Sequence, residues 1–175
     1  VLGEGAAAVI LEDIAHATKR GVKILGEIIG YGSSTVVDTK GKPDPSLAIE
    51  NVLRQALRTS GLTLDQIGHL HAHGLATKTG DREEAQAIQR VFAGRSSPLP
   101  VVAAKGNFGN LGAAGGMVEM LGSLFALAEG RLFPTLNYDT PDPDCPLNVV
   151  TSGDVPAGDT FINVNGTLFF VANDG

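Results

Sequence analysis

The sequence predicts an α/β fold, with helices covering a mixed sheet that holds about five of the six candidate strands given below. Short apolar runs rich in β-branched residues alternate with amphipathic helical patterns along the 175 residues, which is typical of layered α/β proteins. One further segment, Ala113–Ala128, is apolar on nearly all sides and predicts a buried helix. A single sheet covers only one face of such a helix, so we expect a second half-domain or another subunit to cover the other.

The elements follow from apolar periodicity, helix caps and turn residues. Strands are expected at Ala6–Leu11, Val22–Tyr31, His69–His73, Pro100–Ala104, Asn148–Thr151 and Thr160–Val171. Helices are expected at Asp13–Arg20, Asp44–Ser60, Asp81–Phe92 and Ala113–Ala128. In the second helix, Pro45 suits the first turn and Gly61 the C-terminal end. The loops are the Ser- and Lys-containing segment 32–42 and the Pro/Asp-rich segment 134–146.

Composition narrows the possible functions. The net charge of −6 gives no electrostatic footprint for nucleic acid. The longest apolar stretch, Leu111–Ala128, contains Glu119 and four glycines, so no membrane span is expected. The single cysteine, Cys145, excludes an internal disulfide and fits a reducing compartment, so we expect a cytoplasmic protein.

The chain lacks an initiating Met and opens directly into an apolar run, which indicates a fragment or trimmed chain forming one domain, residues 1–175.

Three histidines at positions 69, 71 and 73 alternate along one predicted strand and so share a face. His73 precedes Gly74 at the strand end, where α/β sheets place reactive groups. A histidine there can donate a hydrogen bond or act as a general base, or it can be a structural residue. No Cys or further His follows at metal-ligand spacing, so neither a metal nor a cofactor is expected.

A lysine followed by a Gly-rich turn, Lys105–Gly116, leads from a predicted strand into the apolar helix. Such a turn can present backbone N–H groups to an oxyanion, or it can serve close helix–sheet packing. A buried Lys105 needs a carboxylate partner, and Glu84, in the acidic helix start 81–84, is the predicted one. The alternative is that this acidic cluster only caps a solvated helix start. Cys145 lies among acidic neighbours that disfavour thiolate, so we interpret it as inert.

Four segments together resemble the β-ketoacyl synthases, the condensing enzymes of fatty acid and polyketide synthesis. Val1–Leu11 resembles the family's Gly-Glu-Gly-Ala strand, and Leu70–Thr77 resembles its Asn-Ala-His-Gly-Thr-Ser-Thr motif. Lys105–Gly116 resembles its Lys-Ser-x-x-Gly-His-x-x-Gly-Ala-Ala-Gly motif, and Pro134–Cys145 its Pro-Thr-x-Asn…Pro-Asp-Pro-x-Cys loop. The order and spacing agree over nearly the whole chain.

The resemblance implies the C-terminal half of a thiolase-like fold, in which two α/β halves form five layers. It implies decarboxylative Claisen condensation, with a nucleophilic cysteine in the N-terminal half, outside this chain. The chain alone is therefore predicted to be inactive. The implied partners are an acyl carrier protein or acyl-CoA thioester, and either the N-terminal ketosynthase half or a second copy in a homodimer.

Carried over by position, His73 corresponds to the first catalytic histidine, Lys105 to the lysine and Glu84 to the glutamate. Asn110 replaces the second histidine, which indicates either a decayed site or an amide that donates to an oxyanion, as in Cys-His-Asn condensing enzymes. The C-terminal motif also departs from the family, since Asn163–Phe169 lacks the gatekeeping Phe and Gly pair.

Three functions therefore stay open for the parent protein. It can be an active condensing enzyme, a non-catalytic ketosynthase-like subunit of the chain-length-factor type, or a scaffold that binds acyl carriers. The residue at the family's cysteine position discriminates the first from the other two.

Overall fold

A single mixed sheet organises the computed structural model, which describes residues 1–164 and 168–171. The described strands are β1 (Glu27–Tyr31), β2 (His69–His71), β3 (Pro100–Val102), β4 (Asn148–Val149), β5 (Thr160–Asn163) and β6 (Leu168–Val171). Their order across the sheet is β1-β6-β5-β2-β3-β4. The pairs β5–β2, β2–β3 and β3–β4 are parallel, while β6 runs antiparallel to both β1 and β5. The predicted mixed α/β sheet is confirmed.

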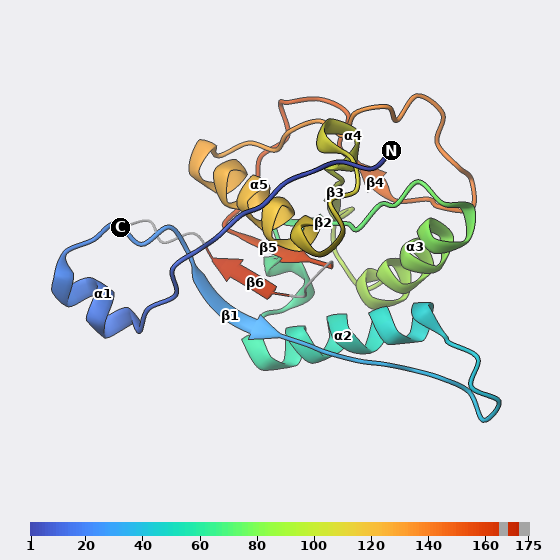
Figure 1. The fold of residues 1–175 in the computed structure, drawn as a ribbon, viewed down its shortest axis with the longest axis horizontal. Helices are drawn as coiled ribbons and strands as arrows, with labels where there is room; N and C mark the ends of the chain where they lie inside the picture. The colour runs from blue at the N-terminus through green and yellow to red at the C-terminus, as the bar shows by residue number, and fades with distance from the viewer. Residues whose placement is uncertain (165–167, 172–175) are drawn as a thin grey trace.

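Helices cover both faces of this sheet, which gives three layers (Figure 1). The α-helices are α1 (Ile14–Arg20), α2 (Pro45–Ser60), α3 (Lys78–Phe92), α4 (Lys105–Phe108) and α5 (Gly115–Glu129). Two short 3-10 turns, η1 (Leu64–Gln66) and η2 (Gly112–Ala114), join them to their neighbours. Helices α2 and α3 lie on one face and α5 lies on the other (Figure 1).

Local sequence signals set the ends of α2. The side chain of Asp44 accepts a hydrogen bond from the backbone N–H of Leu47 at 2.9 Å, and Pro45 occupies the first turn. Gly61 ends the helix with a φ of 72°, a left-handed conformation that glycine adopts without steric cost. The expected helix and its observed bounds therefore agree to within one residue.

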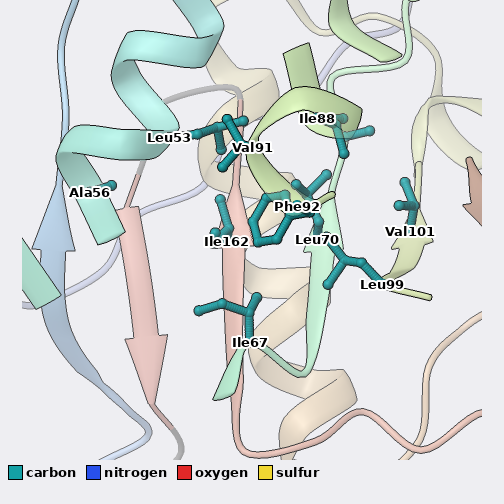
Figure 2. Packing of buried hydrophobic residues seen from close by; sticks show 11 residues of the cluster. Leu53, Ala56, Ile67, Leu70, Ile88, Val91, Phe92, Leu99, Val101 and Ile162 are labelled. Carbon is teal, nitrogen blue, oxygen red and sulfur yellow. The ribbon is translucent and has the colours of Figure 1, made fainter. Parts of the chain in front are cut away.

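Alternation along the strands divides the interior into two apolar clusters. Leu70, Val101 and Ile162 point toward α2 and α3, where they pack against Leu53 and Phe92 (Figure 2). The adjacent residues of the same strands point the other way, and Val102 and Phe161 pack against Met120 and Leu124 of α5. His69 and His71 share this second face, so three-layer packing places buried polar groups directly beneath α5.

The predicted strand Ala6–Leu11 does not form. This segment is anchored at Gly3, whose N–H donates to the carbonyl of Asn110 at 3.0 Å, and it then crosses over α5 (Figure 1). It therefore has no neighbouring strand with which to pair, and the side chains of Ile10 and Leu11 are exposed. The predicted run Thr160–Val171 contains two antiparallel strands, β5 and β6, so the sheet has six described strands rather than five.

Helix α5 has the apolar sequence that was predicted, and its sheet-facing side is buried. On its other side Phe125 is 67% exposed, so the described residues leave part of that face uncovered. No helix in the described part of the chain is long and apolar enough to cross a membrane. The departure noted in the C-terminal motif involves residues 165–167, which lie outside the described residues.

Candidate active site

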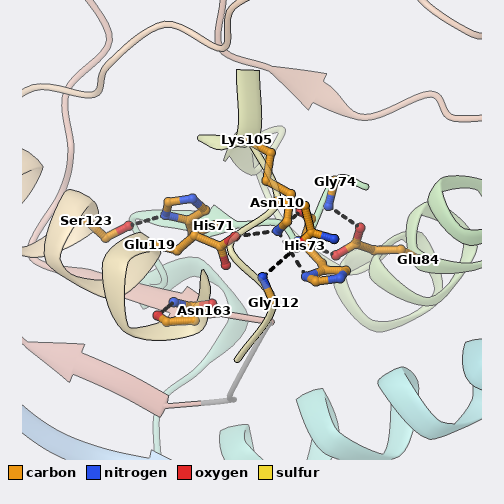
Figure 3. Close-up of polar contacts among 11 residues, drawn as sticks. His71, His73, Gly74, Glu84, Lys105, Asn110, Gly112, Glu119, Ser123 and Asn163 are labelled. Atoms are coloured by element: carbon orange, nitrogen blue, oxygen red, sulfur yellow. Dashed lines mark hydrogen bonds and ion pairs between the residues drawn. The ribbon is translucent and has the colours of Figure 1, made fainter. Parts of the chain in front are cut away.

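His73 lies just beyond the end of β2, and Glu84 holds the backbone there. The N–H groups of His73 and Gly74 donate to the two carboxylate oxygens of Glu84 at 2.7 and 3.0 Å (Figure 3). Burial raises the pKa of Glu84, while the two backbone hydrogen bonds act in the opposite direction. Gly74 has a φ of 53°, so the chain turns sharply after His73. Glu84 of α3 thus fixes the position from which the His73 side chain projects.

Lys105, the first residue of α4, uses its ammonium to join His73 to α5. The Nζ atom donates to the backbone carbonyl of His73 at 2.5 Å and lies 3.1 Å from Nδ1 of the same residue. It also forms an ion pair with Glu119 of α5, whose side chain is completely buried (Figure 3). These contacts match the three donors that a lysine ammonium offers. A charge that is costly to bury is therefore paired and hydrogen-bonded.

The contact with Lys105 determines the tautomer of His73. An ammonium only donates, so Nδ1 must accept and the neutral ring must carry its proton on Nε2. Burial and the positive charge of Lys105 both lower the pKa of His73, which favours the neutral ring. The site therefore holds a neutral histidine whose Nε2–H is the donor left for another group.

Asn110 lies in the Gly-rich turn that follows α4. The backbone N–H of Gly112 faces the Asn110 side chain at 3.1 Å, and a backbone N–H can only donate, so the facing atom is Oδ1. The N–H groups of the Asn110 amide are then the part of the side chain that can donate to a substrate. This arrangement suits the oxyanion role considered for Asn110.

The predicted pairing of Glu84 with Lys105 is wrong, because Lys105 pairs with Glu119. Both carboxylates are buried and both support His73, but Glu84 binds backbone N–H groups and Glu119 binds the ammonium. Sequence spacing favoured Glu84 because it lies near the histidine motif. The signal that could have identified Glu119 is its position as the only charged residue among the apolar residues of helix 113–128. A carboxylate in such a helix needs a buried cation.

His69 and His71 form a second buried group that the sequence did not predict as a unit. Nδ1 of His69 lies 2.9 Å from the carbonyl of Ala157, so it carries the ring proton. Ser123 then donates its hydroxyl proton to Nε2 of His69 at 3.1 Å and accepts from Nδ1 of His71 at 3.0 Å. Burial is the largest cause that lowers both pKa values, to about 4 for His69 and about 3 for His71. Both rings are therefore neutral near pH 7.

The described residues contain no cluster of three His, Cys, Asp or Glu side chains that could hold a metal ion. The thiol of Cys145 is partly buried, and burial, followed by the charge of Asp142, raises its pKa. Thiolate, the nucleophilic form, is therefore disfavoured at Cys145.

The sequence profile of the β-ketoacyl synthase C-terminal domain matches residues 25–139. The chain belongs to the β-ketoacyl synthase family. Among curated proteins, this domain is 39% identical over 150 residues to nodulation protein E of Rhizobium sp. (strain N33), covering 85% of the chain. It is 35% identical over 151 residues, 86% of the chain, to 3-oxoacyl-[acyl-carrier-protein] synthase 2 of Coxiella burnetii. The matches span only 37% and 36% of those two relatives.

Solved structures confirm the thiolase-like ketosynthase fold of this ketoacyl synthase domain. The ishigamide ketosynthase/chain length factor superposes with a TM-score of 0.84 at 29% identity, covering all of this chain and 44% of that one. A type II polyketide ketosynthase in complex with its acyl-carrier protein gives a TM-score of 0.81 at 26% identity, covering 93% of this chain and 42% of that one. The domain is thus a C-terminal ketosynthase domain, as the sequence motifs predicted.

Proposed function

We propose that this domain supplies the malonyl-binding half of a decarboxylative condensing site. The observation that carries the proposal is the contact of Lys105 with Nδ1 of His73, because it leaves Nε2–H as a donor on a neutral ring. A neutral donor stabilises negative charge that develops on a thioester oxygen without protonating it in the ground state. The Asn110 amide is a second donor of the same kind. Glu84 holds the backbone of His73, and Glu119 holds the Lys105 ammonium that contacts the His73 ring.

The reaction has two steps in this account. The malonyl thioester loses CO₂, and the electrons of the broken C–C bond form an enolate whose oxygen accepts hydrogen bonds from His73 and Asn110. The enolate carbon then attacks an acyl thioester on a cysteine supplied from outside this chain. A new C–C bond forms, the cysteine sulfur leaves as thiolate, and the product is a β-ketoacyl thioester.

The substrates follow from this chemistry. We infer that malonyl and acyl groups arrive as thioesters of an acyl carrier protein or coenzyme A, in the cytoplasm. One similar ketosynthase is described in complex with its acyl-carrier protein, which supports the first of these carriers. The exposed side of α5 around Phe125 would be covered by an N-terminal ketosynthase half or by a second copy of the chain.

A non-catalytic subunit of the chain-length-factor type is the second candidate. Two observations favour it, namely Asn110 at the position of the family's second histidine and the likeness to a ketosynthase/chain length factor protein. In that case the same fold would shape a partner's acyl cavity, and the donors of this chain would not touch the reacting atoms.

Replacement of Asn110 by Ala tests the proposal. In the protein that joins this domain to its N-terminal half, we expect kcat for condensation to fall by about 10²–10³-fold with little change in KM, because an oxyanion donor acts mainly in the transition state. The control is Asn107→Ala, an exposed asparagine in the same turn region, which should leave kcat unchanged. An Asn110→Ala protein with wild-type kcat would contradict the proposed role and favour the second candidate.

A further inference from the structure

The first three residues pair with the turn that carries Asn110. The N–H of Gly3 donates to the carbonyl of Asn110 at 3.0 Å, and the N–H of Asn110 donates to the carbonyl of Val1 at 3.0 Å. Leu2 and Asn110 therefore form a parallel bridge outside the main sheet. Both backbone polar groups of Asn110 are used in this way, so the position of its Cα depends on the N-terminal segment Val1–Gly3.

Two glycines allow this close approach. A Cβ atom added to Gly3 would lie 2.0 Å from the carbonyl oxygen of Phe108, a separation that no side chain can adopt. Gly109 has a φ of 79°, and a Cβ there would lie 3.0 Å from the backbone nitrogen of Gly3. Because the contacts on both sides are made by backbone atoms, no side-chain movement can relieve them.

Gly5, two residues further along, differs in the nature of its contact. A Cβ on Gly5 would meet only the side chain of Leu111, with Cδ1 at 2.9 Å. The end of a leucine side chain can rotate away, whereas the Phe108 carbonyl cannot. Gly3 and Gly5 therefore form a matched pair in which only Gly3 is required by the backbone.

We propose that Gly3 is a positioning residue for the Asn110 amide. This inference rests on the proposed function, because it assigns Gly3 the task of aiming an oxyanion donor. The bridge to Val1–Gly3 fixes the backbone of Asn110, and the hydrogen bond from Gly112 to Oδ1 then fixes the side chain. Displacement of a catalytic donor by about 1 Å can lower a rate by about 10²-fold. The backbone bridge therefore determines how effectively the Asn110 amide stabilises the oxyanion.

The experiment compares Gly3→Ala with Gly5→Ala in the protein that contains both ketosynthase halves. Amide hydrogen exchange at Asn110 reports the bridge, and kcat and KM for condensation report its use. For Gly3→Ala we expect exchange at Asn110 to accelerate at least about tenfold and kcat to fall by about 10²-fold with KM nearly constant. For Gly5→Ala we expect neither quantity to change by more than about threefold, since a single flexible side chain can adjust.

A double variant shows whether Gly3 acts through Asn110. In an Asn110→Ala background, Gly3→Ala should lower kcat by no more than about threefold further, because residues that act as a unit are not additive. Additive losses would overturn the positioning role, as would faster exchange at Asn110 with unchanged kcat. Slow exchange at Asn110 in the Gly3→Ala protein would overturn the bridge itself.

Two further outcomes remain interpretable. If Gly3→Ala prevents folding, hydrogen exchange at Asn110 in the unmodified protein tests the bridge instead. An unprotected Asn110 amide would contradict the bridge. If Asn110→Ala alone keeps wild-type kcat, the proposed function fails, while the exchange comparison of Gly3→Ala with Gly5→Ala still tests the bridge separately.

Discussion

Replacing Glu119 by Ala is expected to destabilise the protein by about 3–5 kcal/mol, because it leaves the Lys105 ammonium buried without its countercharge. Only 7% of the Lys105 side chain is exposed and none of the Glu119 side chain is. Bulk water therefore does not solvate the ammonium in the folded protein. Chemical denaturation at pH 7 measures the change, and Glu129→Ala, at the exposed end of the same helix, is the control.

A double variant distinguishes loss of the charge pair from a simple packing defect. Lys105→Met combined with Glu119→Met removes both charges and should recover much of the stability, since a buried ion pair replaced by apolar residues of similar volume is often neutral. It should not recover condensation, because nothing then fixes the tautomer of His73. A Glu119→Ala protein within about 1 kcal/mol of the wild type, the range of an ordinary substitution, would show that the ion pair does not organise the site.

Acid is expected to destabilise the native state through His69 and His71. Their pKa values fall from 6.5 in the unfolded chain to about 4 and about 3 in the folded one. Between these limits the unfolded chain binds protons that the native state excludes. The free energy of unfolding therefore rises with pH across this range. The stability that the two neutral histidines contribute is lost progressively as the pH falls below 6.5. These two groups contribute a slope that approaches about 2.7 kcal/mol per pH unit. His73, whose pKa burial also lowers, adds to it with the same sign.

Urea unfolding at several pH values between 7 and 5 measures this slope. His71→Asn should reduce the slope by about the contribution of one proton, whatever its effect on stability at pH 7. Leu70→Val is the matched control, because Leu70 lies on the opposite face of β2 and should lower stability equally at all pH values. Glu84 contributes a slope of the opposite sign, because burial raises its pKa above 4.5. This contribution offsets the histidine slope only at the acid end of the pH range. A slope near zero from pH 7 to 5 would contradict the buried neutral pair.

Elements with local signals were predictable from the sequence, and elements that depend on distant partners were not. Helix α2 agrees with its prediction because Asp44, Pro45 and Gly61 set its ends without help from the rest of the fold. Ala6–Leu11 has the composition of a strand, but strand formation requires a neighbouring strand, and its anchor at the Asn110 turn leads it over α5 instead.

The same distinction applies to the candidate site. His73, Lys105 and Asn110 could be found because each lies in a short motif at a strand end or turn. The partner of Lys105 could not be chosen from spacing, since Glu84 and Glu119 were both available and only the packing of α5 against β2 brings Glu119 to the ammonium. The bridge of Ser123 between His69 and His71 depends on that packing as well.

Release of CO₂ from a malonyl thioester tests the central claim most directly. The protein that joins this domain to its N-terminal half would be compared with its His73→Ala variant, and His16→Ala, on the exposed surface of α1, serves as the control. The account predicts that His73→Ala lowers the rate by about 10²–10³-fold, the contribution of a positioned hydrogen-bond donor to a developing oxyanion. Equal rates for the wild type and His73→Ala, or no release by the wild type, would contradict it.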